Sequence, residues 1–418
     1  MDALLPHLQS LLGIVAIIAV AWAASEDRKA FDWRLVAGGL GLQLGLALLL
    51  RMVPVARDVL FGLNGAVTAL TTATRAGTAF VFGYLGGGEP PFAVSNAGNL
   101  VNLAFMVLPL IMTISALSAV LWHWGILSAI VRAMAYVLRR VMGLGGAVGL
   151  GAAATVFLGN IEGQLVIRPY LARMSRTELF ILMTTGLAVI AGTVFVLYAT
   201  ILGPVLPGAL GHLLVASMMS LPAAILLARI MVPGDAETGD SGSDGHKYRS
   251  TMDALADGTW GGARIFAQVI AMLLVTVAMV ALVNIILAQL PGLDGAPLTL
   301  ERILGWVFAP VVWLYGVPWS EAVTAGGLMG TKVVLNELIA YLNLAKMPPG
   351  ALDPRATQIM VYAMCGFGNL ASVGILIAGM GALVPERRDE IVPLAMKALL
   401  SGVMASGLTG CMIGMLPL

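Results

Sequence analysis

Long apolar runs constrain this chain more than any other feature of its sequence. Several stretches, such as residues 261–290, exceed the roughly 18 apolar residues that a helix needs to cross a bilayer. Of the 418 residues, 59% are hydrophobic and 11% are charged, and the mean hydropathy is +0.94. Water-soluble domains carry about 25% charged residues. The sequence therefore predicts an all-α polytopic membrane protein.

Charge, cysteines and motifs exclude several other classes. A formal net charge of +1 argues against a nucleic-acid partner. Cys365 and Cys411 lie in apolar sequence, which indicates neither a disulfide framework nor a metal cluster. We find no metalloprotease or serine-hydrolase motif, so neither an enzyme nor an organic cofactor is expected. The amino terminus, MDALLPHLQS, lacks Lys and Arg, so we interpret the first apolar run as a retained helix.

Hydropathy predicts eight spanning helices. They lie at about residues 9–24, 33–52, 98–122, 177–203, 208–232, 261–290, 357–384 and 390–415. Residues 53–84 are apolar but interrupted by charged and polar side chains, including Arg57 and Arg75. This pattern is typical of a helix that lies along the membrane interface.

The placement of Lys and Arg predicts the orientation and the domain plan. The loop 25–34 is basic and the residues before the first span are not, so both termini are predicted to be external. The hydrophilic segment 233–258 is predicted to be a cytoplasmic linker. It follows the amino-terminal helices of 1–97 and separates two units, 98–232 and 259–418, of opposite orientation. Such inverted repeats are common in secondary transporters.

Two further apolar regions contain glycine, proline and polar residues and do not look like single spans. The first, about 126–175, has a glycine-rich stretch before Glu162, and the second, about 300–345, contains Asn336 and Glu337. Irregular backbone is tolerated at membrane depth only where protein or a water-filled cavity satisfies its hydrogen bonds. We therefore predict two opposed re-entrant hairpins whose tips meet near the membrane midplane.

A carboxylate at such a tip needs an explanation, because a charge at the bilayer centre costs about 2.5–3.5 kcal/mol on insertion scales. Glu162 is either a structural charge, paired with Arg168 or lying among the headgroups, or an acceptor for a polar ligand. The second hairpin independently offers an amide beside a carboxylate, Asn336 and Glu337. Two hairpins with the same chemistry favour a binding site.

The stretch CGFGNLASVG at 365–374 forms a third polar cluster. Each glycine weakens a helix by about 1 kcal/mol relative to alanine, so we predict a discontinuous helix whose backbone can contact a ligand. The alternative is a kinked helix in which Asn369 bonds a neighbouring helix. Phe367 suits a planar ring, and Asn369 and Ser372 suit hydroxyl groups. A sugar joined to a planar base fits these residues, although they alone do not select it.

Seven ordered motifs resemble the concentrative nucleoside transporter family from about residue 78 to the carboxyl end. They are FVFGYL (80–85), GNIEGQLVIRPYL (159–171), IAGTV (190–194), MDALADG (252–258), GVPWSEA (316–322), GTKVVLNELIAYL (330–342) and CGFGNLASVG (365–374). The resemblance implies a homotrimer in the lipid bilayer of the bacterial inner membrane. In each subunit a transport domain would move against a scaffold of the first three spans and the sixth, importing nucleosides with Na⁺ or H⁺ by alternating access.

The resemblance also implies a set of substrate-binding residues. The matching positions are Asn160, Ile161, Glu162, Val194, Glu337, Phe367, Asn369 and Ser372. Glu337, Asn369 and Ser372 match the contacts to ribose, and the others match positions around the base. Asn160 and Ile161 depart from the family's usual Gln followed by Ser or Thr, and a missing hydrogen-bond partner can shift substrate discrimination. A nucleobase, modified nucleoside or sugar is therefore an alternative substrate, and a non-transporting nucleoside sensor is an alternative function.

The coupling ion is the second point of departure. Positions that match the family's sodium ligands are Thr155, Leu158, Val189 and Ile190. Thr155 replaces a usual Asn and Val189 a usual Ser, which leaves fewer side-chain oxygens for a hard cation but retains the backbone carbonyls. Coupling to H⁺ through Glu162 competes with this interpretation, since a carboxylate removed from water binds a proton more readily. The sequence leaves Na⁺ and H⁺ as near equals.

Overall fold

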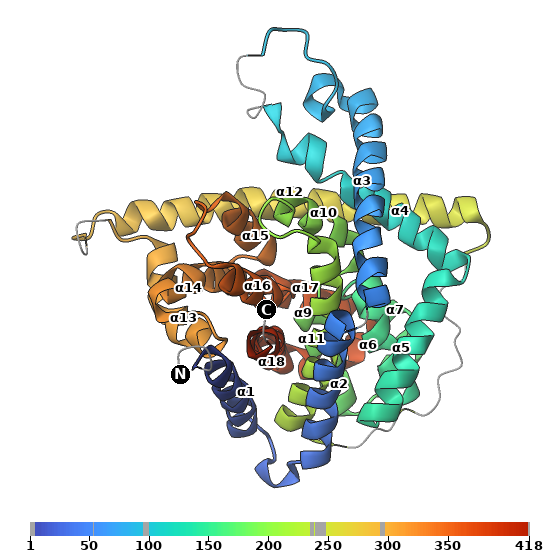
Figure 1. The fold of residues 1–418 in the computed structure, drawn as a ribbon. Helices are drawn as coiled ribbons and strands as arrows, with labels where there is room; N and C mark the ends of the chain where they lie inside the picture. The colour runs from blue at the N-terminus through green and yellow to red at the C-terminus, as the bar shows by residue number, and fades with distance from the viewer. Residues whose placement is uncertain are drawn as a thin grey trace.

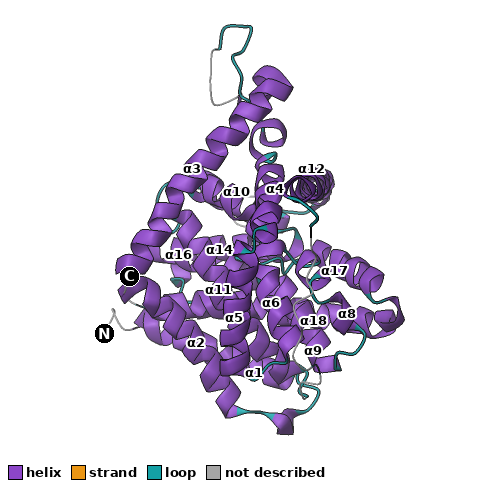
Figure 2. Ribbon diagram, turned by 90° about the vertical axis from the view of Figure 1, so that its right-hand side faces the viewer, coloured by secondary structure: helices purple, strands orange, loops and turns teal. Residues whose placement is uncertain are grey.

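The computed structural model describes residues 5–52, 54–94, 100–234, 238, 248–292 and 297–416. The described residues form helices joined by turns and loops, with no strand among them (Figures 1 and 2). The prediction of an all-α polytopic fold is confirmed.

The first three helices lie on the outside of a helical body. They are α1 (Leu5–Ala23), α2 (Trp33–Met52) and α3 (Pro54–Phe82). Helix α1 packs on the last helix of the chain and α2 packs on α11 (Ala209–Met231). The far end of α3 extends away from the body in Figure 1. That residues 53–84 lie along a membrane interface stays a prediction, because no bilayer defines the interface here.

The middle of the chain is more finely divided than the sequence predicts. The elements before α11 are a π-helical turn (Leu103–Val107), α4 (Leu110–His123), α5 (Ile126–Met142), α6 (Gly146–Leu158), α7 (Glu162–Leu165), α8 (Arg168–Leu171), α9 (Arg176–Ala188) and α10 (Gly192–Leu202). The predicted hairpin at 126–175 is therefore too long, since only α6 and the short helices α7 and α8 form it. The predicted span 177–203 is interrupted at residues 189–191.

The second half begins with α12 (Thr251–Leu287), which runs across the molecule in Figure 1. Ser250 caps this helix by accepting a hydrogen bond from the Asp253 amide at 3.1 Å. The predicted linker 233–258 is therefore wrong at its end, because its last residues are helical. Thr238, also within it, is buried and bonded to Glu178.

The remaining helices complete the second half. They are α13 (Leu300–Leu314), α14 (Trp319–Val334), α15 (Glu337–Lys346), α16 (Pro354–Met364), α17 (Leu370–Leu383) and α18 (Arg388–Met415). Helices α13 and α14 meet at a bend of 115°. The second hairpin thus consists of α14 and α15, and the predicted break in CGFGNLASVG is confirmed by the separation of α16 from α17.

Helix length and hydropathy support fewer complete spans than the eight predicted. Within the part of the chain that the structure describes, five helices are long and apolar enough to cross a membrane, or six if α13 and α14 count as one. The predicted spans 9–24 and 33–52 contain shorter apolar helices, His7–Ala23 and Trp33–Leu48. The predicted span 357–384 is divided between α16 and α17.

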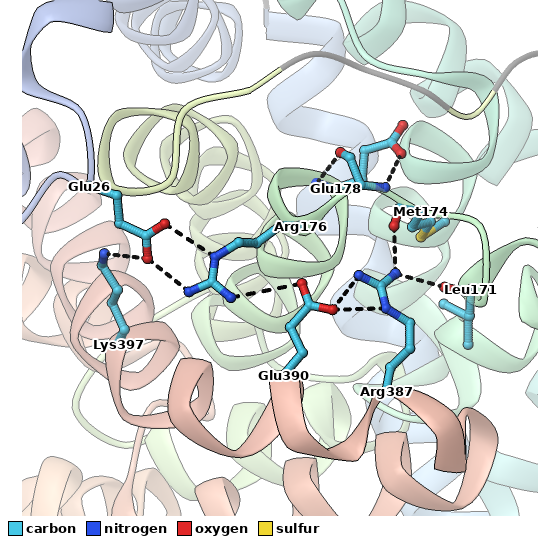
Figure 3. Close-up of polar contacts among 9 residues, drawn as sticks. Glu26, Leu171, Met174, Arg176, Glu178, Arg387, Glu390 and Lys397 are labelled. Atoms are coloured by element: carbon cyan, nitrogen blue, oxygen red, sulfur yellow. Dashed lines mark hydrogen bonds and ion pairs between the residues drawn. The ribbon is translucent and has the colours of Figure 1, made fainter.

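A cluster of charged side chains joins three separate segments at one end of the molecule (Figure 3). Glu26, in the loop after α1, accepts hydrogen bonds from Arg176 at 3.0 Å and from Lys397 at 3.1 Å. Arg176 also approaches Glu390 at 3.8 Å, and Arg387 pairs with Glu390 at 2.5 Å. These contacts connect the amino-terminal helices to the first turns of α9 and α18. At the other end of α1, His7 lies 2.9 Å from the carbonyl of Met415, so α1 and α18 are antiparallel.

Candidate functional site

Interrupted helices surround a cavity of about 210 Å³. Its wall includes the tip of the first hairpin, the tip of the second hairpin and the break between α16 and α17. Residues from α10 and α12 complete it. All eight substrate-binding residues predicted from the sequence line this cavity: Asn160, Ile161, Glu162, Val194, Glu337, Phe367, Asn369 and Ser372.

The second hairpin contributes a carboxylate that is held from two sides. Glu337 is the first residue of α15 and is 4% exposed. The Tyr198 hydroxyl donates to its Oε1 at 2.7 Å, and the Asn369 amide donates to its Oε2 at 3.1 Å. An ionised carboxylate can accept about four hydrogen bonds. Each oxygen therefore retains capacity for a ligand donor, which makes Glu337 a fixed acceptor at the cavity wall.

Asn369 links this carboxylate to the start of α17. Its side-chain oxygen accepts a hydrogen bond from the Ser372 amide at 2.8 Å, which caps the helix, while its nitrogen donates to Glu337. Ser372 is buried next to it and lines the cavity. The sequence-based alternative, in which Asn369 bonds a neighbouring helix, describes part of the observed geometry, because Glu337 belongs to such a helix.

Side chains at the tip of the first hairpin point in different directions. Asn160 accepts a hydrogen bond from Gln164 at 3.2 Å and lies against Gly186 of α9, where an added methyl group would collide with its oxygen. Ile161 lies against Gly379 of α17 in the same way. Glu162 is exposed and folds back toward Gly159.

The ion pair between Glu162 and Arg168 that the sequence left open is not formed among the described residues. The positive charge that acts on Glu162 belongs to Arg264 of α12. The carboxylate therefore faces the cavity mouth and a neighbouring helix, and it is free of a close cationic partner within the described chain.

The rest of the wall is largely apolar. Val194 is buried in α10, and Phe367 is half-buried in the break between α16 and α17. Helix α12 adds Val269, Met272 and Leu273. The cavity lining thus combines Glu337 and its polar neighbours with an aromatic ring and aliphatic groups. An amphipathic ligand with one hydroxyl-rich end and one flat apolar end matches this combination.

The four predicted ion ligands lie where two helix breaks approach each other. Thr155 is buried, and its hydroxyl donates to the Gly151 carbonyl at 2.8 Å, so its oxygen lone pairs stay available. The Val189 carbonyl accepts from the Phe367 amide at 3.2 Å. A methyl group on Gly192 would come within 2.6 Å of the Phe157 carbonyl, which shows how closely α10 approaches the end of α6. Leu158 is the last residue of α6, and Ile190 lies in the break between α9 and α10. Their backbone carbonyls are the kind of oxygen ligand that a hard cation prefers.

Sequence reasoning missed two polar groups at this site. Tyr198, which holds Glu337, is a lone phenol inside an apolar span, and a buried phenol usually has a hydrogen-bond partner. Gln268 lies on α12 at the cavity wall. The signal in each case is a polar side chain within a predicted span, but only the fold identifies its neighbours.

Three segments of the chain match known sequence families. Residues 12–85 match the Na⁺ dependent nucleoside transporter N-terminus, residues 212–414 match the Na⁺ dependent nucleoside transporter C-terminus, and residues 104–205 match a nucleoside recognition family called Gate. Together they include both hairpins and every helix break that surrounds the cavity.

Similar proteins extend over almost the whole chain. Nucleoside permease NupC of Helicobacter pylori is 34% identical over 414 residues, which cover 97% of each protein. An uncharacterized transporter of Bacillus subtilis, YutK, is 37% identical over 98% of this chain and 99% of its own length. Sodium/nucleoside cotransporter 1 of Rattus norvegicus is 30% identical over 98% of this chain but only 64% of its own length.

Solved structures of the transporter CNTnw share the fold. The inward-facing substrate-bound state superposes with a TM-score of 0.89 at 37% identity, covering 98% of both chains. A CNTnw variant in an outward-facing state gives a TM-score of 0.90 at 36% identity, covering 98% of this chain and 97% of the other. The overall similarity therefore does not distinguish one transport state from the other.

An all-helical membrane fold in which interrupted helices enclose a cavity is typical of secondary transporters. With these matches over its full length, the chain belongs to the concentrative nucleoside transporter family. Membership makes it a multi-pass membrane protein of a family of transporters.

Proposed function

We propose that this protein is an ion-coupled symporter that imports nucleosides by alternating access. The observation that carries the proposal is the position of the Glu337 carboxylate at the cavity wall. Tyr198 and Asn369 each donate one hydrogen bond to it, and its oxygens can accept further hydrogen bonds from a ligand. Vicinal hydroxyl groups of a sugar are donors that a fixed carboxylate binds well, because hydrogen bonds to charged groups contribute about 1.5–3 kcal/mol.

In this proposal the nucleoside lies with its sugar toward Glu337, Asn369 and Ser372. Its base is surrounded by Phe367, Val194, Asn160 and Glu162. An aromatic ring stacked on a planar base adds an attraction beyond simple burial. The base edge has fewer protein partners than the sugar, since Asn160 is bonded to Gln164 and Ile161 lies on Gly379. We therefore propose that sugar recognition dominates binding.

Sodium is the coupling ion we favour. The family matched here is described as Na⁺ dependent, and the close approach of Gly192 to the Phe157 carbonyl supports a site between the breaks at 159–161 and 189–191. The same hairpin also contains Gln164 Oε1, a buried oxygen without a donor among the described residues. We propose that Na⁺ binds at Thr155, Leu158, Val189 and Ile190. Proton coupling is the second candidate, and the position of Glu162 at the cavity favours it.

The domain plan follows the order of the elements. Two single helices, a hairpin, a broken helix and a final long helix follow one another in α4–α11 and again in α12–α18. We propose that these two units, about 98–232 and 259–418, are inverted repeats. The amino-terminal residues 1–97, α4 and α12 would then form the scaffold of each subunit in a homotrimer. The start of α1 and the end of α18 lie at the same end of the molecule, opposite the basic loop 25–34. We therefore propose that both termini are external.

Uptake into proteoliposomes tests the proposal directly. Purified protein is reconstituted, and uridine and adenosine accumulation is measured under an inward Na⁺ gradient and, separately, an inward H⁺ gradient. We expect accumulation with Na⁺, unaffected by a protonophore, and none with the Glu337→Gln variant. Accumulation under H⁺ alone assigns coupling to Glu162. Failure of both nucleosides under both gradients overturns the proposal and favours a different solute at the altered base edge.

A further inference from the structure

Lys332 is a buried cation to which the proposed transport cycle assigns no role. It lies in the last turn of α14, on the opposite side of the hairpin tip from Glu337, and its side chain is 0% exposed. An ammonium group has three hydrogen-bond donors. Among the described residues its one hydrogen-bond partner is the Ser406 hydroxyl of α18, at 3.4 Å. A buried ammonium with a single neutral partner is strongly unfavourable unless a negative charge lies nearby.

The ammonium group lies directly behind the cavity wall. A methyl group on Gly368 would come within 3.2 Å of Lys332 Nζ and within 3.3 Å of the Leu187 carbonyl. Gly368 separates Phe367 from Asn369, and both of these residues line the cavity. The cation therefore contacts the back of the same short segment whose front faces a ligand.

Glu337 supplies the opposite charge. It is the acidic side chain whose charge acts on Lys332, although its own close donors are Tyr198 and Asn369. The other titratable groups facing the two charges are the Cys365 thiol and the phenols of Tyr198 and Tyr341. Such groups are uncharged at neutral pH in their usual ranges. The basic and the acidic side chain of this buried centre both lie at the segment 367–369, Lys332 beside Gly368 and Glu337 bonded to Asn369.

We propose that Lys332 is a positioning residue for the sugar site, whose positive charge favours the ionised form of Glu337, so that both carboxylate oxygens accept hydrogen bonds. A protonated carboxyl group would present one donor and lose acceptor capacity where sugar hydroxyls must donate. This inference rests on the proposed function, because only in a nucleoside transporter would Glu337 accept hydrogen bonds from sugar hydroxyl groups. The charge compensation itself can be measured without any nucleoside.

The first test is a double-mutant cycle in thermal stability, with Lys332→Met, Glu337→Gln and the double variant purified in detergent at pH 7.5. Removing one member of a buried charge pair leaves the other uncompensated, whereas removing both restores neutrality. We expect each single variant to lower Tm by about 5–10 °C and the double variant to lie within about 3 °C of the wild type. Lys397→Met, which removes a partly exposed lysine, serves as the matched control.

The second test is the pH dependence of uridine binding between pH 5.5 and 7.5. Without the cation, Glu337 takes up a proton at a pH where the wild-type carboxylate is ionised. We expect Lys332→Met to bind uridine at least about tenfold more weakly at pH 5.5 than at pH 7.5, and the wild type to change by less than about threefold. A role in packing alone would weaken binding equally at both pH values.

The outcomes of these two tests distinguish a failure of the role proposed for Lys332 from a failure of the proposed transport function. Additive Tm changes, or a Lys332→Met protein with the wild-type pH profile, overturn the role of Lys332. If Lys332→Met does not fold, recovery of a folded protein in the double variant supports charge compensation, and equal failure of both variants contradicts it. If the wild type binds no uridine, the proposed function fails, and the stability cycle still decides whether the charges compensate each other.

Discussion

The tips of the two hairpins look alike in sequence and differ in structure. Each places an amide close to a glutamate, Asn160 before Glu162 and Asn336 before Glu337. In the second hairpin the glutamate is buried and accepts two side-chain hydrogen bonds. In the first hairpin the glutamate is exposed and has no close cation among the described residues.

The amides also have unrelated roles. Asn336 accepts a hydrogen bond from the Ile339 amide at 2.9 Å and so caps α15, whereas Asn160 lies on Gly186 and bonds Gln164. A short motif fixes which groups are present at a tip. The helices packed around the tip decide which of those groups reach the cavity, so the two carboxylates contribute unequally.

The largest expected difference between the tips is in substrate binding. Glu337→Gln replaces a charged acceptor by a neutral amide, which also donates, so we expect uridine affinity to fall about 10- to 150-fold. Glu162→Gln changes an exposed carboxylate, and we expect less than about a threefold loss of affinity. Isothermal titration of both purified variants measures the two effects. Equal losses would remove the asymmetry between the tips.

Packing of the first tip can be tested without changing the tip itself. Gly186→Ala places a methyl group where the Asn160 oxygen lies, so we expect it to destabilise the protein by about 1–3 kcal/mol. Gly374→Ala is the matched control, because an added methyl group there meets nothing within 4 Å and alanine favours a helix. Thermal unfolding of the two variants gives the comparison. A Gly186→Ala protein as stable as the control would mean that Asn160 is free to move.

Some of this site could be predicted from the sequence and some could not. Glycines and polar residues within apolar runs indicated the tips and the α16–α17 break, because such residues disfavour a continuous helix. The sequence did not predict the helix break at 189–191, because its residues are apolar like those of the helices around it. The close approach of Gly192 to α6 depends on tertiary packing, which no local pattern indicates. Similarly, the Tyr198–Glu337 contact joins residues 139 positions apart, and no local pattern encodes it.

The second tip should depend on Asn336 for its helix rather than for ligand binding. Asn336→Ala removes the cap of α15, which typically costs about 1 kcal/mol, while Asn336→Asp retains a capping oxygen. We therefore expect the alanine variant to unfold at a lower temperature and the aspartate variant to behave like the wild type, with similar uridine affinity in both once folded. A large loss of affinity in the folded aspartate variant would instead place Asn336 in ligand binding.

Glu26 provides a third carboxylate, already surrounded by water, against which the two tips can be calibrated (Figure 3). Its hydrogen bonds from Arg176 hold the pKa of Glu26 below its usual range, and Lys397 adds to this effect. The resulting stabilisation is present above the usual pKa of a glutamate and is lost as the pH falls through the lowered value. Because Glu26 and Arg176 are 37% and 45% exposed, we expect Glu26→Gln to cost less than about 1 kcal/mol at neutral pH.

The difference between wild type and Glu26→Gln should also shrink in about 1 M salt and disappear below the lowered pKa of Glu26, where both side chains are uncharged. Thermal unfolding across pH and salt measures both trends. Glu162 resembles Glu26 in exposure but lacks its close cations, so a Glu162→Gln variant should show still less dependence on salt. If Glu162→Gln instead proves the more salt-sensitive of the two, Arg264 of α12 holds that carboxylate more firmly than its exposure indicates, and the contrast between the two tips narrows.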